Sequence, residues 1–389
     1  MQAFEYCNPT KIVFGCGRVK EVGEIAKTFG NRVMFVSYDR EMVDSIGLLH
    51  KALDPLLQKN LTICEYYGVK SNPSLNHARE GVKIAKEFKP DVLVALGGGS
   101  VIDECKCIAA SVASGKDIWW LVEHPDVTDF PSLPVIAVCT IPATSSEMNN
   151  IGVISNDETH VKDGIEGQSV YPAVALLDPL LTLTIPMRQT ANSVADICSY
   201  LLEGYISHQE SFVPMVEMYD ESFIKTQMLC MERLLKNPQD VDARAQLMWA
   251  ATNSWNGFCV LGIGEYEALF HALGHTLSEL FDTPHGASLA MVMPAALTYT
   301  APRRIERYAQ LSRNIFGVQE EDDKKAAKAA GQEMQKWLRH IGAPSTFTEG
   351  NIPLDRLDDI KARAYQNVHD YGYNAYTEED VYAIIDLCV

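Results

Sequence analysis

The amino-acid sequence predicts an α/β domain with a parallel sheet over residues 1–187 and an all-helical domain over residues 188–389. Three observations support this fold class. A chain of 389 residues is too long for one ordinary hydrophobic core. In the first half, short β-rich runs alternate with helical patterns, as in βαβ units. After Pro186 the strand-like runs almost vanish and long helical patterns follow.

Short apolar runs mark six predicted strands in the first half. Helical patterns such as those at 18–30 and 75–88 lie between them, and strands that alternate with such helices pair in parallel. The predicted strands are residues 11–15, 32–38, 61–67, 91–97, 134–141 and 173–178.

The second half contains predicted helices at 194–209, 241–255 and 322–341. The first of them is expected to begin near Asn192, because asparagine is a residue type that caps helices. The acidic run at 320–325 favours a helix start, since negative charge stabilises a helix N-terminus.

The composition argues against several classes of protein. The 51 acidic residues outnumber the 33 basic ones, and a net charge of −18 disfavours nucleic acid or an anionic membrane as a partner. No run of 18 apolar residues and no signal peptide is visible, so we expect neither a membrane span nor secretion. The ten cysteines are scattered without a C-x-x-C pair, which favours buried free thiols in a reducing cytoplasm.

A glycine run follows the predicted strand at 91–97. Gly97, Gly98, Gly99 and Ser100 precede a helical pattern, and backbone N–H groups at such a place can bind a phosphate. The run lacks the G-K-[ST] ending of a Walker loop and does not match G-x-G-x-x-G. Phosphate binding and a plain turn both fit this run.

Three histidines lie close together in the stretch FHALGHTLSELFDTPH. His271 and His275 share a helix face, and His285 follows a proline that should end this helix. Such spacing suits a metal site, although a single histidine is more often structural. Asp196, in the helical segment at 194–209, is the best candidate for a carboxylate ligand.

Five ordered segments resemble one known family, the iron-containing (group III) alcohol dehydrogenases, and are similar to its butanol dehydrogenase and aldehyde reductase branch. The resemblance implies a dehydroquinate synthase-like fold, with a dinucleotide-binding domain at 1–187 and a helical metal and substrate domain at 188–389. The segments are GGGSVIDECK (97–106), TIPATSSEMNNIGVIS (140–155), LLDPLLTLTIPMRQTANSVAD (176–196), MWAATNSWNG (248–257) and FHALGHTLSELFDTPHGASLAMVMPA (270–295).

The resemblance also implies roles for individual residues. Asp196, His271 and His285 look like ligands of a divalent iron or zinc ion. His275 looks like a non-ligand histidine beside the nicotinamide and the substrate. The residues expected to bind the dinucleotide are Asn72, Gly97, Gly98, Gly99, Ser100, Asp103, Thr140, Thr144, Asn149 and Lys162, the last of them at the ribose.

Two residues depart from the family pattern. Tyr200 stands where this branch has a fourth histidine ligand, and a neutral phenol is a poor ligand for a divalent ion. We therefore expect a three-ligand site with an open position, or else a metal-free reductase in which Tyr200 and His275 donate protons. Ser145 stands where the branch usually has glycine, and it is expected to narrow the cofactor or substrate pocket.

The choice of nucleotide is predicted from Asp39, which follows the strand at 32–38. A carboxylate at this point hydrogen-bonds the ribose 2′-OH and repels a 2′-phosphate. The sequence therefore favours NAD(H), with NADP(H) as the alternative.

Together these implications describe an alcohol dehydrogenase or aldehyde reductase that acts on a small alcohol or aldehyde. The metal polarises the substrate oxygen, the nicotinamide exchanges hydride, and His275 passes the proton. Two alternatives are a dehydroquinate-synthase-like lyase and a non-catalytic nucleotide-binding relative. The lyase is disfavoured because residues 250–290 contain no lysine or arginine for a phosphorylated substrate.

Trp255, Phe258 and Phe270 lie near the histidine cluster in the sequence and are either pocket residues or core residues. Resemblance to the family implies a homodimer or a larger homo-oligomer.

Overall fold

The computed structural model describes residues 1–159, 161–207 and 212–389, which form two compact units. We call them the α/β unit and the helical unit. The domain limits predicted from the sequence, 1–187 for the dinucleotide-binding domain and 188–389 for the helical metal and substrate domain, remain a prediction. The α/β unit comprises Cys7–Ile185 and Leu247–Asn256, and the helical unit comprises Met1–Tyr6, Pro186–Gln246 and Gly257–Val389.

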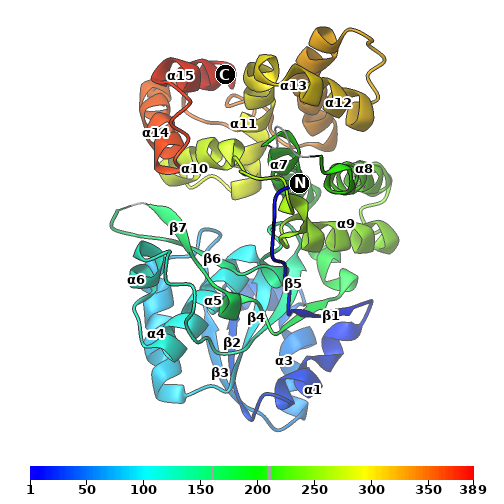
Figure 1. The fold of residues 1–389 in the computed structure, drawn as a ribbon. Helices are drawn as coiled ribbons and strands as arrows, with labels where there is room; N and C mark the ends of the chain where they lie inside the picture. Colours follow the sequence, from blue (N-terminus) through cyan, green and yellow to red (C-terminus); the bar gives the residue numbers. More distant parts are fainter. Residues whose placement is uncertain (160, 208–211) are drawn as a thin grey trace. The chain divides into compact units, whose positions relative to one another are not determined.

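A six-stranded parallel sheet lies at the centre of the α/β unit and confirms the predicted fold class (Figure 1). Its strand order is β1-β8-β5-β4-β2-β3. All six predicted strands are present, with small shifts at their ends. They are β1 (Lys11–Phe14), β2 (Arg32–Ser37), β3 (Thr62–Tyr67), β4 (Val92–Gly98), β5 (Val135–Ile141) and β8 (Val174–Leu177).

Helices cover both faces of this sheet, which is why its central strands are apolar throughout. Helices α1 and α3 pack on one face around Phe35 and Val94, whereas α4, α5 and α6 pack on the other around Met34 and Ala95. The helices of this unit are α1 (Val22–Lys27), α2 (Arg40–Ser45), α3 (Leu49–Gln58), α4 (Leu75–Phe88), α5 (Gly99–Ser114) and α6 (Ile118–Glu123), with 3-10 turns η1 (Arg18–Glu21), η2 (Ser146–Met148), η3 (Gln168–Val170) and η4 (Pro179–Thr184).

The strand order reverses beside β2, because β3 lies on one side of it and β4 on the other. Open α/β sheets bind ligands outside the carboxyl ends of their strands at such a point. The ends of β2 and β4 meet here, where the backbone N–H of Gly98 donates to the Tyr38 hydroxyl at 3.2 Å.

Two features of the α/β unit differ from the sequence prediction. The helix predicted at 18–30 is a 3-10 turn followed by the short α1, which ends at Lys27 where the Thr28 hydroxyl donates to the Ile25 carbonyl. An antiparallel hairpin of β6 (Ile151–Ser155) and β7 (Lys162–Glu166) was not predicted. Its strands are short, and β7 carries charges and a glycine, so neither has a strong apolar signal.

The helical unit packs around α11, which is buried along almost its whole length. The fold confirms the predicted helical second half, and the Asp322 carboxylate caps α13 as the acidic run indicated. The helices are α7 (Met187–Ser207), α8 (Pro214–Lys236), α9 (Val241–Ser254), α10 (Leu269–Phe281), α11 (His285–Thr300), α12 (Ile305–Phe316), α13 (Asp323–Ile341), α14 (Leu357–Asp370) and α15 (Glu378–Asp386), with 3-10 turns η5 (Phe258–Val260), η6 (Ala301–Arg303) and η7 (Leu354–Arg356). The last eight residues of α9, Leu247–Ser254, belong to the α/β unit.

Helix α7 begins earlier than predicted. It starts at Met187 and not near Asn192, because the Pro186 carbonyl already accepts the Thr190 N–H at 3.0 Å. Asn192 is therefore inside the helix. The last two residues of the predicted segment at 194–209 lie outside the described residues.

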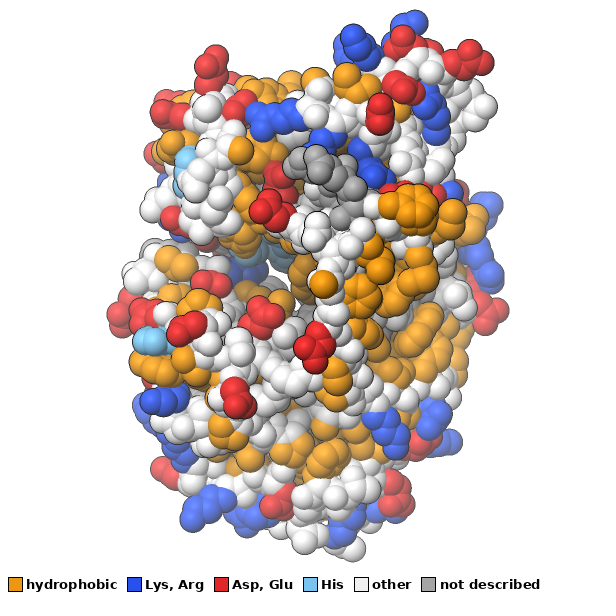
Figure 2. All heavy atoms as spheres, viewed as in Figure 1, with side chains coloured by type: hydrophobic (Ala, Val, Ile, Leu, Met, Phe, Trp, Pro, Cys, Tyr) orange, Lys and Arg blue, Asp and Glu red, His pale blue; other side chains and the backbone are white. Residues whose placement is uncertain are grey.

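The surface carries mixed charge, and no helix among the described residues is both long and apolar enough to cross a membrane. Figure 2 shows apolar side chains gathered over α8, where Met215 and Met218 are exposed. Seven of the ten cysteines are buried free thiols as predicted, whereas Cys7 and Cys16 are exposed and Cys64 is half-buried.

Candidate metal centre and cofactor site

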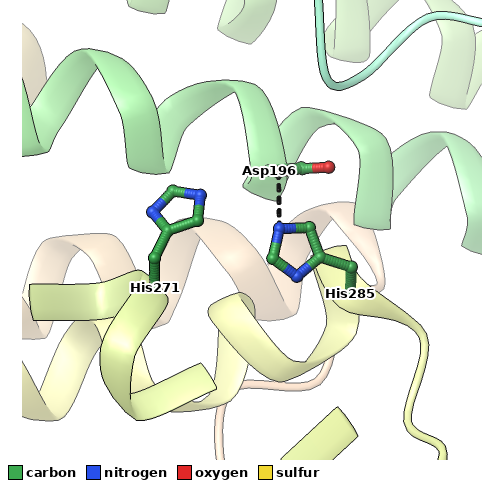
Figure 3. A group of neighbouring side chains, drawn as sticks. All are labelled: Asp196, His271 and His285. Carbon is green, nitrogen blue, oxygen red and sulfur yellow. Dashed lines mark ion pairs between the residues drawn. The ribbon is translucent and has the colours of Figure 1, made fainter. Parts of the chain in front are cut away.

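Asp196, His271 and His285 come together in the helical unit (Figure 3). One potential ligand atom from each lies within 4.8 Å of the others. Asp196 and His271 are buried and His285 is half-buried. The distance from Asp196 Oδ1 to His285 Nε2 is 3.6 Å. One carboxylate and two imidazoles at these separations form a donor set that suits divalent iron or zinc.

The two histidines lie on consecutive helices because of the residues between them. Helix α10 ends at Phe281, where Asp282 adopts a left-handed conformation with φ of 51°. Pro284 then forms the N-cap of α11, so that His285 is the first residue of this second helix.

A glycine allows α11 to approach α7 closely. A methyl group at Gly286 would lie 2.1 Å from the carbonyl oxygen of Asn192, a distance at which something must move. Because Gly286 has no side chain, the start of α11 packs directly on the α7 backbone. This contact sets His285 beside Asp196.

His275 lies one helical turn after His271, and its ring centroid is 5.3 Å from that of His285. Its Nδ1 atom is 2.9 Å from the hydroxyl oxygen of Tyr371. Tyr371 is 38% exposed, so this hydrogen bond leads from the buried histidine toward the surface. Tyr371 stands 96 positions away, and no local sequence signal pointed to it.

Tyr200 lies one turn after Asp196 on α7, and its ring packs against His271 with centroids 4.4 Å apart. Cys198 faces away from the cluster, since its Sγ contacts Gln227 Oε1 on α8 at 3.6 Å.

Glu203 is a member of this cluster that the sequence analysis did not single out. It is fully buried on α7, two turns after Asp196, and its carboxylate is hydrogen-bonded to His271. The spacing of two helical turns, which puts both acids on one face, is the signal that could have revealed it.

The predicted glycine loop is a direct junction between a strand and a helix in the α/β unit. Strand β4 ends at Gly98, and α5 begins at Gly99 with Gly98 as its N-cap. Gly99 and Ser100 are half-buried, so the start of α5 is partly open to solvent, as a phosphate site at this helix N-terminus would require. Packing also requires a glycine here, because a methyl group at Gly99 would lie 2.3 Å from Thr144 Oγ1. The other threonine, Thr140, is buried on β5.

Two further predicted cofactor residues lie beside this junction. The Ser100 hydroxyl donates to the carbonyl of Ser71, which brings the segment after β3 to the start of α5. The next residue, Asn72, accepts a hydrogen bond at Oδ1 from Lys162 Nζ on β7 at 3.2 Å.

A buried polar network lies behind the junction. Asp103 Oδ1 accepts from the Ser146 hydroxyl at 2.5 Å, and Lys106 Nζ donates to Asn149 Oδ1 at 2.9 Å. Asn149 Nδ2 donates to the Thr144 carbonyl at 3.2 Å. Burial raises the pKa of Asp103 to about 6 and lowers the pKa of Lys106 to about 8. Asn149 therefore holds the loop after β5 against α5, a contribution that the sequence did not reveal.

Asp39 lies on the surface at the end of β2, where it caps α2. Its Oδ1 accepts the backbone N–H of Met42 at 2.9 Å. The preceding residue, Tyr38, contacts Gly98, so Asp39 follows directly on the part of the chain that touches the junction. Its part in the choice of nucleotide remains a prediction.

Ser145 adopts a left-handed conformation with φ of 52°, a backbone conformation that favours glycine. Its side chain is buried and turned toward the end of α9. The hydroxyl donates to the Ala251 carbonyl, lies 3.0 Å from Ser254 Oγ and accepts the backbone N–H of Trp255 at 2.8 Å. The expectation that it narrows a pocket remains untested, since these contacts serve to fasten the loop after β5.

The three aromatic residues near the cluster in sequence have separate surroundings. Phe270 is fully buried in the helical unit, and Phe258 packs on Tyr219 with ring centroids 4.6 Å apart. Trp255 belongs to the α/β unit. Core packing accounts for Phe270, whereas Phe258 is half-buried.

These two sites, an accessible helix start on a parallel sheet and a buried carboxylate–imidazole cluster, agree with what family models detect in the chain. Residues 9–179 match the model of iron-containing alcohol dehydrogenase, and residues 190–388 match that of the Fe-containing alcohol dehydrogenase family, C-terminal. The chain belongs to the iron-containing alcohol dehydrogenase family and is an NAD(P)-dependent oxidoreductase of that family. Membership sets aside the lyase and the non-catalytic alternatives.

Individual relatives fall in the branch that the sequence motifs indicated. NADH-dependent butanol dehydrogenase A of Clostridium acetobutylicum is 33% identical over 94% of each chain. The NADPH-dependent aldehyde reductase YqhD of Escherichia coli is 30% identical over 90% of this chain and 89% of its own. The crystal structure of NADH-dependent butanol dehydrogenase A from Thermotoga maritima superposes with a TM-score of 0.92 at 32% identity, covering 100% of this chain and 99% of that one.

Proposed function

We propose that this protein interconverts small aldehydes and alcohols with NAD(H) and with a divalent iron or zinc ion held by Asp196, His271 and His285. The cluster of these three side chains is the observation that carries the proposal. When bound, the metal supplies Lewis acidity toward the substrate oxygen and the nicotinamide supplies or accepts hydride. Relatives named as butanol dehydrogenase and aldehyde reductase support this substrate class.

In this proposal the protein's own residues orient the substrate and move its proton. His275 exchanges a proton with the substrate oxygen. Its hydrogen bond to Tyr371 then relays a proton toward the surface. Tyr200 packs on His271 and contributes no fourth ligand, so the three protein ligands leave a position open to substrate.

The first experiment is the metal content of the purified protein, together with NADH-dependent reduction of a panel of short aldehydes before and after chelation. Stoichiometric iron or zinc, with activity lost on stripping and restored by re-addition, supports the three-ligand centre. A metal-free protein that still turns over refutes it. That result would favour the alternative reductase, in which Tyr200 and His275 donate protons and Y200F should then lose activity.

We also propose that the α/β unit binds NAD(H) in preference to NADP(H), with the phosphates at Gly98, Gly99 and Ser100. The Asp39 carboxylate at the end of β2 supports this preference, since it would repel a 2′-phosphate. The test compares kcat/KM for NADH and NADPH in the wild type and in D39S. The wild type should prefer NADH, and D39S should shift the ratio toward NADPH. A wild-type preference for NADPH would contradict the argument.

We further propose a cytoplasmic homo-oligomer, in which the seven buried free thiols stay reduced. Light scattering of the purified protein measures the oligomeric state, and a monomer at micromolar concentration would contradict that part.

A further inference from the structure

A second acid shares the α7 face that carries Asp196. Glu203 lies two turns further along this helix and is 0% exposed. Charged residues are almost never fully buried unless partners compensate them. The partners of Glu203 therefore indicate what it does.

Three hydrogen bonds converge on the Glu203 carboxylate. Oε2 lies 2.6 Å from His271 Nδ1 and accepts from the Tyr266 hydroxyl at 2.8 Å. Oε1 accepts the backbone N–H of His271 at 3.0 Å. That N–H belongs to the first turn of α10, whose N–H groups have no partner within the helix. Glu203 thus holds both the side chain and the backbone of His271.

The hydrogen bond at Nδ1 determines which atom of the imidazole can bind a metal. When the carboxylate accepts from Nδ1, the imidazole carries its proton there and its lone pair at Nε2. Figure 3 shows one ring nitrogen of His271 on the side of Asp196 and His285 and the other on the far side. A carboxylate at the far nitrogen orients a metal-binding histidine and makes it a more basic ligand.

The surroundings of the two acids agree with this role. Asp196 and Glu203 are both buried on α7. Residues 250–290 contain no lysine or arginine, and Arg304, which donates to the Ile206 carbonyl, is paired with Glu267. A bound dication would lower the cost of burying the two acids as carboxylates.

We propose that Glu203 is a positioning residue of the metal centre, which fixes His271 as an Nε2 ligand, with Tyr266 holding the Glu203 carboxylate in turn. This inference rests on the proposed function for the metal centre itself. It does not require any particular substrate or nucleotide.

The test is a titration of the chelated, full-length protein with Zn²⁺, and with Co²⁺ for its visible spectrum. In E203Q the side chain keeps nearly the same shape but loses the charged acceptor. E203Q should bind Zn²⁺ about 10- to 100-fold more weakly than wild type and should show an altered Co²⁺ spectrum. Y266F should bind Zn²⁺ several-fold more weakly, up to about tenfold, because it removes a single hydrogen bond. The matched control is D220N, which changes another fully buried acid, on α8, and should bind both ions like wild type.

A double variant links the effect to His271. In H271A, which has lost this ligand, adding E203Q should cause no further loss of Zn²⁺ affinity. Equal Zn²⁺ affinity and equal Co²⁺ spectra in E203Q and wild type would overturn the proposal. If E203Q fails to fold, Y266F decides, and an unchanged affinity in Y266F overturns it.

The outcomes also separate this inference from the proposed function. A wild type that binds neither ion at this site refutes the metal centre, and with it the role of Glu203. A wild type that binds Zn²⁺ but reduces no aldehyde refutes the proposed reaction and leaves the loss in E203Q as support for the positioning role.

Discussion

At position 145 we expect the glycine variant to be more stable than the alanine variant, which reverses the usual order of these two residues. Ser145 is fully buried and left-handed, and its hydroxyl makes three hydrogen bonds at the end of α9. Either replacement leaves the Trp255 N–H without this acceptor, which costs about 1–3 kcal/mol. S145A also keeps the left-handed backbone, which costs an L-residue roughly 1–2 kcal/mol.

S145G relieves that backbone strain. Glycine also makes the unfolded chain more flexible, which lowers the free energy of unfolding by about 0.4–1 kcal/mol. We therefore expect wild type to be the most stable and S145G to exceed S145A by about 1 kcal/mol or slightly less. The assay is urea denaturation followed by tryptophan fluorescence, compared through the midpoints at unchanged slope.

The pair S111A and S111G provides the control. Ser111 is a buried serine inside helix α5 of the same unit, where alanine should exceed glycine by about 0.5–1 kcal/mol. If S145A proves more stable than S145G, which is the order expected at position 111, then the left-handed backbone at residue 145 does not carry the strain that its φ implies.

Three other changes test different parts of the molecule. G286A should lower the thermal midpoint and weaken Zn²⁺ binding, because the methyl group would meet the Asn192 carbonyl 2.1 Å away; unchanged binding would contradict the close α7–α11 packing. Burial raises the pKa of Asp103 to about 6, so the folded state keeps a proton that the unfolded chain releases. Wild type should therefore lose stability relative to D103N as pH rises from about 4 to 6. A difference between the urea midpoints of the two proteins that stays constant over this pH range would refute this. Y371F should lower kcat about tenfold or more without changing Zn²⁺ affinity, since His275 loses its partner at Nδ1; a wild-type kcat would show that this bond has no role in proton transfer.

The α/β unit could be predicted well because its signals are local. Each central strand is buried on both faces and therefore appears as a short apolar run, and β4 leads directly into the glycines that start α5. The hairpin of β6 and β7 was missed because its short strands carry little apolar pattern. The early start of α7 was missed because its first backbone hydrogen bond runs from the Thr190 N–H to the Pro186 carbonyl and involves no asparagine side chain.

The metal cluster was predictable only in part. His271 and His275 share a helix face by their spacing, which any reader of the sequence can see. Asp196 was only a weak candidate from its own segment, and resemblance to a family was needed to tie it to the histidines. Glu203 could have been found from its position two turns after Asp196, although its partner His271 stands 68 positions away.

The sequence by itself determined the class of fold, the glycines at the strand–helix junction and the residue types of the candidate metal site, because periodicity, glycine placement and residue chemistry are properties of neighbouring positions. Only the tertiary structure showed which atoms of those side chains face one another. The hydrogen bond of Glu203 to His271, that of Tyr371 to His275 and the contact of Gly286 with α7 join segments far apart in the chain. Such contacts depend on how helices pack, and no local pattern encodes them.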